Sequence, residues 1–209
     1  MISLPLVYTI LALVAYTSSF WYLFIRLMSK RTPNLWCYSI MIGLGLLLHS
    51  TVLYQDMMTP IGVNYDVFNL MSFTSGLMLA LSLILSFIRP ILPLNLIGTP
   101  VAAIGLILGY AFSQPNQVIE QHSLGLDLHI ILSLSAYAVL LMATIHSVLL
   151  WFQDRELKKK QKRRIWVNLL PPFQVMESVL FDLIITGFGL LTAALLFGFF
   201  TIDNFFAQH

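Results

Sequence analysis

The stretch Leu126–Trp151, LDLHIILSLSAYAVLLMATIHSVLLW, decides what kind of protein this chain forms. Its 26 residues include no lysine or arginine, and about 20 apolar residues are enough to cross the hydrocarbon core of a bilayer. We therefore expect a transmembrane helix here. At about 100° per residue, His129, Ser133 and Tyr137 fall on one stripe of that helix. A histidine inside a membrane segment is costly, so this stripe is a candidate functional site.

The composition of the whole chain extends this interpretation to the class of integral membrane proteins. Hydrophobic residues make up 58% of the 209 residues and charged residues only 10%, whereas a soluble domain carries about 25% charged residues. Five further apolar runs are long enough to span a bilayer. The six expected spans are 6–27, 35–54, 67–88, 94–112, 126–151 and 175–200. We predict an all-α membrane protein with a single transmembrane domain over residues 1–209, built as an antiparallel bundle of six helices.

The basic residues give the expected orientation of the bundle. All eleven lysines and arginines lie in, or at the edge of, the loops that follow the first, third and fifth spans. Lysine and arginine collect on the cytoplasmic side of membrane proteins, so both termini are expected on the outer side. The most basic segment, residues 155–164, is interpreted as a topology determinant that touches anionic lipid headgroups, and no nucleic-acid partner is expected.

Two smaller features limit the chemistry and the packing. The single cysteine, Cys37, allows no internal disulfide, no CxxC pair and no CxxCH haem-attachment motif, which excludes a thiol oxidoreductase and a c-type cytochrome. In the fourth span, Pro100 is expected to kink or locally open the helix. The GxxxG spacing of Gly105 and Gly109 is expected to let another helix approach closely.

The histidines form a pattern once the orientation is assigned. Four of the five, His49, His122, His129 and His209, lie at or near the expected outer face. His49 and His129 lie close to the outer ends of two different spans, so at about 1.5 Å per residue they have similar depth. His146 lies roughly 25 Å deeper than His129, because it is 17 residues further along the same helix.

Two imidazoles at matched depth in an apolar, aromatic surrounding favour haem over a hydrolytic metal centre. Imidazole binds zinc, copper, nickel and iron, and it is a common axial ligand of haem. A metal hydrolase would show clustered ligands, and neither HExxH nor HxxxH occurs in this chain. A lone histidine in a span is also a frequent packing and hydrogen-bonding residue, so a structural role stays open for each of them.

The fifth span and its continuation resemble a known family. The run HIILSLSAYAVLLMATIHSVLLWFQDRELKKK, which begins at His129, is similar to the signature helix of the cytochrome c assembly protein family, the CcsA/ResC/CcmC-like haem handlers. The resemblance is strongest to its YpjD-like inner-membrane branch, which shows H-x-x-L-S-x-x-A-Y followed by Q-D-x-x-L-K. The matching residues here are His129, Leu132, Ser133, Ala136, Tyr137, Gln153, Asp154, Leu157 and Lys158.

Further matches extend the resemblance over essentially the whole chain. They are Phe68, Asn69 and Ser72, then Leu170, Pro171, Pro172, Gln174, Met176 and Glu177, then Gly187, Phe188, Leu190, Leu191 and Thr192, and the tail 204–209. The chain looks short at its C-terminus relative to the family. A phenylalanine-rich segment, 199–206, stands where the family has a tryptophan-rich one, and relatives usually continue with further spans.

The resemblance implies a function. It implies a multi-pass protein of the inner membrane that binds or translocates haem b toward the outer face during cytochrome c maturation. It implies axial-ligand or haem-entry roles for His129, His49 and His209, with Ser133 and Tyr137 shaping the haem slot. Asp127 or Asp66 is expected to fix an imidazole tautomer. The expected partners are the lipid bilayer and, on the outer side, other cytochrome c assembly proteins or the apocytochrome; no enzymatic step is expected.

Two other functions stay open on the residues alone. A small transporter or channel would use His146, Asp182 and the proline-containing fourth helix as a polar route. A non-catalytic membrane partner protein would dock other proteins through its GxxxG helix and basic loop, and its histidines would be structural. The structural alternative for Asp182 is a neutral or locally paired carboxyl group near the cytoplasmic interface.

Overall fold

The computed structural model describes residues 4–60, 62–114, 118–119, 124–158 and 170–206. Within these ranges it contains six helices that are long and apolar enough to cross a membrane. They are α1 (Leu4–Met28), α2 (Leu35–Met57), α3 (Val67–Ile88), α4 (Asn95–Phe112), α5 (Leu124–Leu157) and α6 (Phe173–Phe206). The prediction of an all-α membrane protein with six spans is therefore confirmed.

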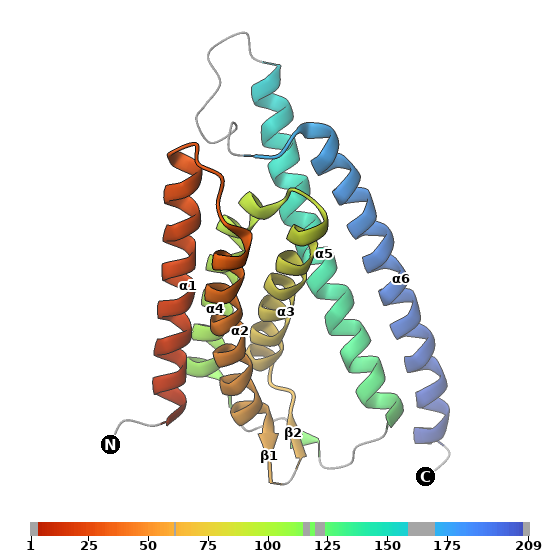
Figure 1. The fold of residues 1–209 in the computed structure, drawn as a ribbon. Helices are drawn as coiled ribbons and strands as arrows, with labels where there is room; N and C mark the ends of the chain where they lie inside the picture. Colours follow the sequence, from red (N-terminus) through yellow and green to blue (C-terminus); the bar gives the residue numbers. More distant parts are fainter. Residues whose placement is uncertain (1–3, 61, 115–117, 120–123, 159–169, 207–209) are drawn as a thin grey trace.

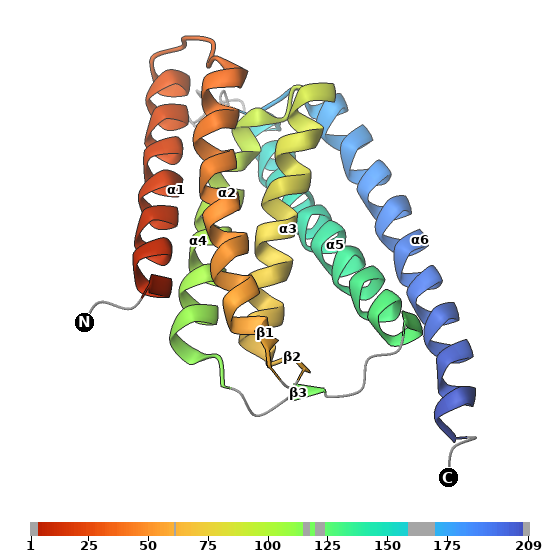
Figure 2. The same ribbon diagram turned by 60° about the horizontal axis from the view of Figure 1, so that its bottom comes forward.

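The helices run up and down and form two parts that lie side by side. Helices α1 to α4 pack together as a four-helix unit, and α5 and α6 form a long pair that meets this unit along α3. Figure 1 shows this arrangement, and Figure 2 shows the α5–α6 pair splayed away from α1 at the end of the molecule where α1 begins. The antiparallel order follows from the short connections between successive spans.

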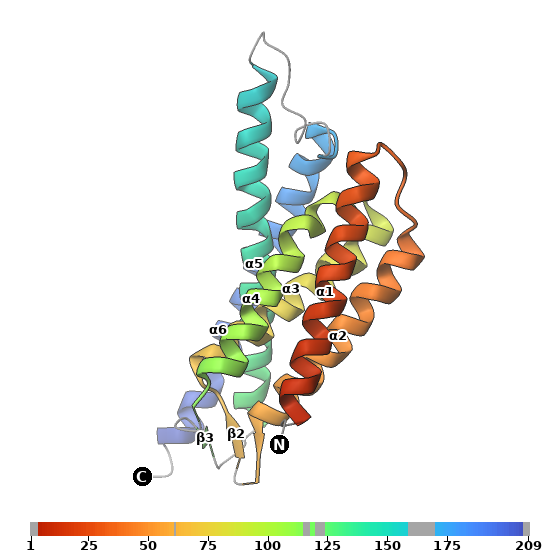
Figure 3. The same ribbon diagram turned by 90° about the vertical axis from the view of Figure 1, so that its left-hand side faces the viewer.

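The basic residues that the structure describes gather at one end of this bundle. The last turns of α1 and α5 carry Arg26 and Arg155, and Arg89 follows the last residue of α3. These three helix ends lie together, whereas α1 begins and α6 ends at the opposite end (Figure 1). At the basic end α5 projects beyond the other helices, which is clearest in Figure 3. The positive-inside rule assigns this end to the cytoplasmic side, and the opposite end is called the outer end below.

A small antiparallel sheet closes the outer end. Its strands β1 (Met58–Thr59), β2 (Gly62–Asn64) and β3 (Val118–Ile119) are hydrogen-bonded in that order, with Val63 opposite both Met58 and Ile119. The sheet joins the connection after α2 to the connection after α4. The sequence analysis treated both segments as loops, because strands of two or three residues are too short to show an alternating pattern.

Two hydrophobic clusters hold the parts together. One cluster lies between α3, α5, α6 and the short 3₁₀ helix Leu92–Leu94; its buried members are Met78, Ile91, Leu94, Ala138, Val139, Met142, Ala143, Met176, Val179 and Leu183. The other lies inside the four-helix unit; its buried members are Ala12, Tyr16, Leu23, Tyr38, Ile42, Val52, Leu79, Ala102 and Leu106. The first cluster fixes α5 against α3, and this contact positions the candidate site.

The GxxxG spacing of α4 does bring another helix close, as the sequence analysis predicted. A Cβ atom added at Gly109 would lie 2.8 Å from the Cβ of Ser72, and one added at Gly105 would lie 2.8 Å from the Cβ of Ser75. Both serines are on α3, so the two backbones can touch only because these positions lack side chains. Helix α4 continues from Asn95 to Phe112 through Pro100, so the proline does not divide the helix into two segments.

We expect Gly105→Ala to destabilise the protein by about 1–3 kcal/mol, because the new methyl group overpacks the α3–α4 contact. Gly43→Ala is the matched control, since a Cβ at Gly43 would meet no atom within 4 Å. The thermal unfolding midpoints of both variants in detergent check this. Equal midpoints would contradict the close approach of α3 and α4.

Candidate functional site

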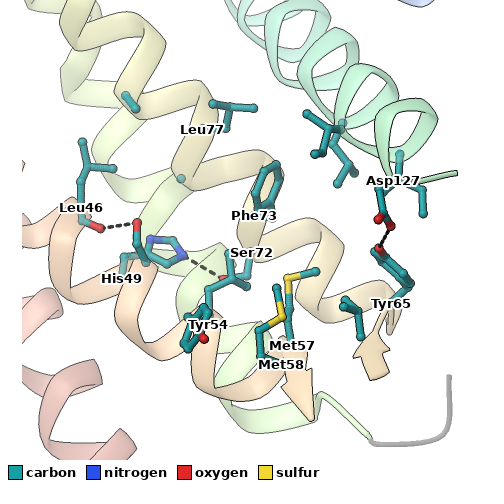
Figure 4. A pocket seen from close by; sticks show the side chains of 18 residues that line it. Leu46, His49, Tyr54, Met57, Met58, Tyr65, Ser72, Phe73, Leu77 and Asp127 are labelled. Carbon is teal, nitrogen blue, oxygen red and sulfur yellow. Dashed lines mark hydrogen bonds between the residues drawn. The ribbon is translucent and has the colours of Figure 1, made fainter. Parts of the chain in front are cut away.

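A cavity of about 680 Å³ lies between α2, α3 and α5 at the outer end of the bundle (Figure 4). Its wall is mainly apolar and includes Leu46, Leu53, Met57, Phe73, Leu77 and Leu134. Its polar side chains are those of His49, Ser50, Tyr54, Tyr65, Ser72 and Asp127. Small-molecule sites typically measure about 300–1,000 Å³ and are apolar with a few polar groups that set orientation. The cavity is therefore the candidate binding site.

His49 is held on the cavity wall by hydrogen bonds at both of its ring nitrogens, one of which donates while the other accepts. The side chain is 2% exposed, its Nδ1 lies 3.0 Å from the hydroxyl of Tyr16, and its Nε2 lies 2.8 Å from the hydroxyl of Ser72. Figure 4 shows the ring beside Ser72 at the edge of the cavity. Gly76 makes room for the ring, because a Cβ there would lie 3.1 Å from His49 Cε1. Nε2 is occupied by its bond with Ser72, so a metal ion could bind there only if that bond were broken.

His129 faces α6 instead of the cavity. Its Nδ1 lies 2.7 Å from the carbonyl oxygen of Ala194, and its ring packs at Gly198, where a Cβ would come within 2.8 Å of the ring. A carbonyl oxygen only accepts hydrogen bonds, so Nδ1–H donates, and in the neutral ring Nε2 carries the lone pair. This is the tautomer that a metal ion at Nε2 requires.

The two predicted histidines are thus not brought together in one cavity. The cavity side of α5 is formed by Asp127, Ile130, Ile131 and Leu134, and His129 projects from a different face of the helix. A single haem held between the two rings would require α5 to change its packing against α6. The helical rise predicts a depth for each histidine, but it does not tell which neighbouring helix each ring meets.

Ser133 and Tyr137 are not among the residues that line the cavity. Ser133 is half-buried on α5, and Tyr137 is 54% exposed, which places its ring toward lipid. His209, like His122, lies outside the residues that the structure describes. The predicted set therefore reduces to one imidazole in the cavity, His49, and one between α5 and α6, His129.

A second polar pair, missed by the sequence analysis, lies on the other side of the cavity from His49. The hydroxyl of Tyr65, just before α3, lies 3.3 Å from a carboxylate oxygen of Asp127. Burial and the neighbouring Asp127 carboxylate raise the pKa of Tyr65, so its hydroxyl stays a donor. Asp127 thus accepts from a tyrosine, and a role for it in fixing an imidazole tautomer stays a prediction. Asp66 caps α3 by accepting from the backbone N–H of Phe68 at 2.9 Å.

The deeper polar residues do not join this site. His146 is buried among apolar side chains, with Nδ1 2.9 Å from the carbonyl of Met142 in its own helix. Asp182 is exposed at the cytoplasmic end and forms an ion pair with Arg89 at 3.3 Å, which is the locally paired arrangement allowed above. Among the described residues, no three His, Cys, Asp or Glu side chains come together as a metal site.

The family of the chain can now be stated. The model of the family described as "Cytochrome C assembly protein" matches residues 4–209, and the chain belongs to this family. The resemblance inferred from the fifth span is therefore confirmed.

Among curated proteins, the chain is similar to the inner membrane protein YpjD of Escherichia coli. YpjD of strain K12 is 32% identical over 103 residues, which cover 48% of this chain and 38% of YpjD. YpjD of strains O6:H1 and O157:H7 matches with the same values. The matched region thus spans well under half of the length of these curated relatives. No solved structure matches the chain.

We expect Tyr16→Phe to destabilise the protein by about 1–3 kcal/mol, because it leaves Nδ1 of the buried His49 without its partner. Tyr137→Phe makes the same chemical change on a lipid-exposed ring and serves as the control; its stability should not change. The measurement is thermal unfolding of both variants in detergent. A Tyr16→Phe protein as stable as the wild type would argue against the His49–Tyr16 bond.

Proposed function

We propose that this chain is a haem-handling factor for cytochrome c maturation in the inner membrane, and that the cavity between α2, α3 and α5 receives the apolar body of haem b. The observation that carries the proposal is a buried imidazole, His49, on the wall of an apolar cavity of about 680 Å³ in a chain of this family. No covalent step by the protein is needed for this function, so we propose a binding and transfer role without enzymatic activity.

The donor set of the cavity fits this cofactor. Haem is a broad apolar plane whose iron takes axial ligands such as imidazole. His49 offers Nε2 once Ser72 releases it, and the Tyr16 hydroxyl keeps the ring oriented through Nδ1. Phe73, Leu77 and other apolar side chains of the wall would pack against the plane. An apolar surround also keeps water away from such a group.

His129 supports a second position for haem at the outer end. Metal-binding histidines commonly donate the other ring N–H to a carbonyl or carboxylate, and His129 donates to the carbonyl of Ala194 in this way. Because the two rings face different neighbours, we propose that His49 and His129 hold haem one after the other. Ser133 and Tyr137, on the stripe of His129, and His209 in the tail would assist at the second position.

The outer end is also where we place the partners of this function. Haem delivered from either imidazole reaches the outer side of the membrane, where other cytochrome c assembly proteins or the apocytochrome would receive it. The name of the relative, inner membrane protein YpjD, supports the same membrane for this chain.

The test is a haem-binding measurement on the protein purified in detergent. We expect added haemin to give a shifted Soret band, and both His49→Ala and His129→Ala to weaken haemin binding at least about tenfold, a loss of about 1.4 kcal/mol. His146→Leu is the control, because His146 is buried among apolar side chains far from the outer end. Its haemin affinity should match that of the wild type.

Two results would count against the proposal. One is a colourless wild-type preparation that also fails to shift the Soret band of added haemin. The other is haemin binding that neither outer histidine variant weakens, because a ligand held without either imidazole is not held in the proposed way.

A further inference from the structure

Four of the residues that line the cavity are also exposed on the surface of the bundle. Tyr54 is 66% exposed, Ile131 is 53% exposed and Met58 is 49% exposed. Ser50 is exposed as well. A side chain that lines a cavity and also lies on the surface marks an opening, so these four residues define the mouth of the cavity. The mouth lies between α2 and α5, which Figure 4 shows on opposite sides of the cavity.

The packing of the helices leaves room for this mouth. Helix α2 packs mainly against α1 and α3, and α5 packs mainly against α6 and α3. Helix α3 is thus the common neighbour, and it supplies the back wall of the cavity with Ser72, Phe73 and Leu77. Helices α2 and α5 form the two sides.

The deeper part of the mouth lies within the membrane. Ser50 lies seven residues before Met57, where α2 ends, and Ile131 lies seven residues after Leu124, where α5 begins. At about 1.5 Å per residue, both are roughly 10 Å from the outer ends of their helices. Half of a bilayer's hydrocarbon core is about 15 Å thick. The mouth therefore faces the lipid chains of the outer leaflet.

The end of the cavity that points toward water is more closed than this side. Met57 and Val63, which line the cavity at the outer end, are each only 8% exposed. Val63 belongs to the sheet that joins the two outer connections. The hydrogen bond between Tyr65 and Asp127 also links the segment before α3 to the first turn of α5.

The polar side chains of the mouth are compatible with lipid. The hydroxyl of Ser50 donates to the carbonyl of Leu46 in its own helix at 2.9 Å, so it needs no water. Tyr54 lies three residues before the end of α2, at the level where tyrosine and tryptophan collect in membrane proteins. An apolar molecule can therefore pass these side chains without leaving a buried polar group unpaired.

We infer that haem reaches this cavity sideways, from the outer leaflet of the bilayer, through the mouth between α2 and α5. This inference rests on the proposed function and adds the route of entry to it. The ligand is then a molecule dissolved in the membrane, as the broad apolar ring of haem permits. A strongly hydrated solute would have to lose its water before it reached the mouth.

The first experiment narrows the mouth and measures the rate of haemin binding. Ser50→Trp and Ile131→Trp each place a large side chain in the mouth. In lipid nanodiscs, stopped-flow Soret absorbance should show haemin associating at least about fivefold more slowly with each variant than with the wild type. An obstacle on the route slows release as well, so the equilibrium affinity should change by less than about threefold.

The chain offers a matched control for each variant. Thr51 is the exposed neighbour of Ser50, does not line the cavity, and makes the same kind of bond, to the carbonyl of Leu47 at 2.9 Å. Val148 is a β-branched residue of α5 that is 49% exposed and does not line the cavity. Thr51→Trp and Val148→Trp should bind haemin at the wild-type rate.

The second experiment needs no haem. Ala80→Cys, in a Cys37→Ser background, allows a bimane label to be attached to the cavity lining. A phosphatidylcholine with bromine atoms in its acyl chains should quench the fluorescence of this label, and iodide in the water should not. Quenching by iodide, or no quenching by the brominated lipid, would overturn the lateral mouth.

The outcomes separate the two proposals. If the two mouth variants bind haemin as fast as their controls, the lateral route is overturned and haem binding itself stands. If the wild-type protein gives no Soret shift with haemin, the proposed function falls and the haem route falls with it.

Discussion

The need to satisfy every backbone hydrogen bond inside the hydrocarbon layer governs this protein. Helices meet that need within one segment, so six apolar runs become six helices and the irregular connections lie at the two ends. The small polar side chains follow the same constraint. Thr17, Ser39 and Thr144 each donate to a carbonyl four residues earlier in their own helix, so they cost little in an apolar surround.

His49 is a buried polar group whose bonds come from helices other than its own. Its ring is bridged by Tyr16 on α1 and Ser72 on α3, and Ser72 can take its place because Gly109 of α4 has no side chain. Three helices thus cooperate to hold one imidazole at a cavity wall. The close α3–α4 packing and the candidate binding site are therefore one piece of structure.

The sequence predicts the fold well because span length and charge position are simple physical signals. The third span, 67–88, has the bounds expected for it, and α5 differs mainly by continuing past the membrane boundary to Leu157. The site was harder to foresee. The helical period shows on which face of its helix His129 lies, but not that this face meets Ala194. Likewise, nothing in the order of residues pairs Tyr65 with Asp127, which lie 62 positions apart. Such contacts depend on how helices turn toward one another.

The carbonyl of Ala194 has a further consequence. In α6 that oxygen is also the regular acceptor for the backbone N–H of Gly198, so the ring of His129 competes with the helix for it. A cation bound at Nε2 withdraws electrons from the imidazole and makes Nδ1–H a stronger donor. The backbone hydrogen bond from Gly198 to the same oxygen then weakens. The stability of the final turns of α6 therefore depends on what is bound to a side chain of another helix.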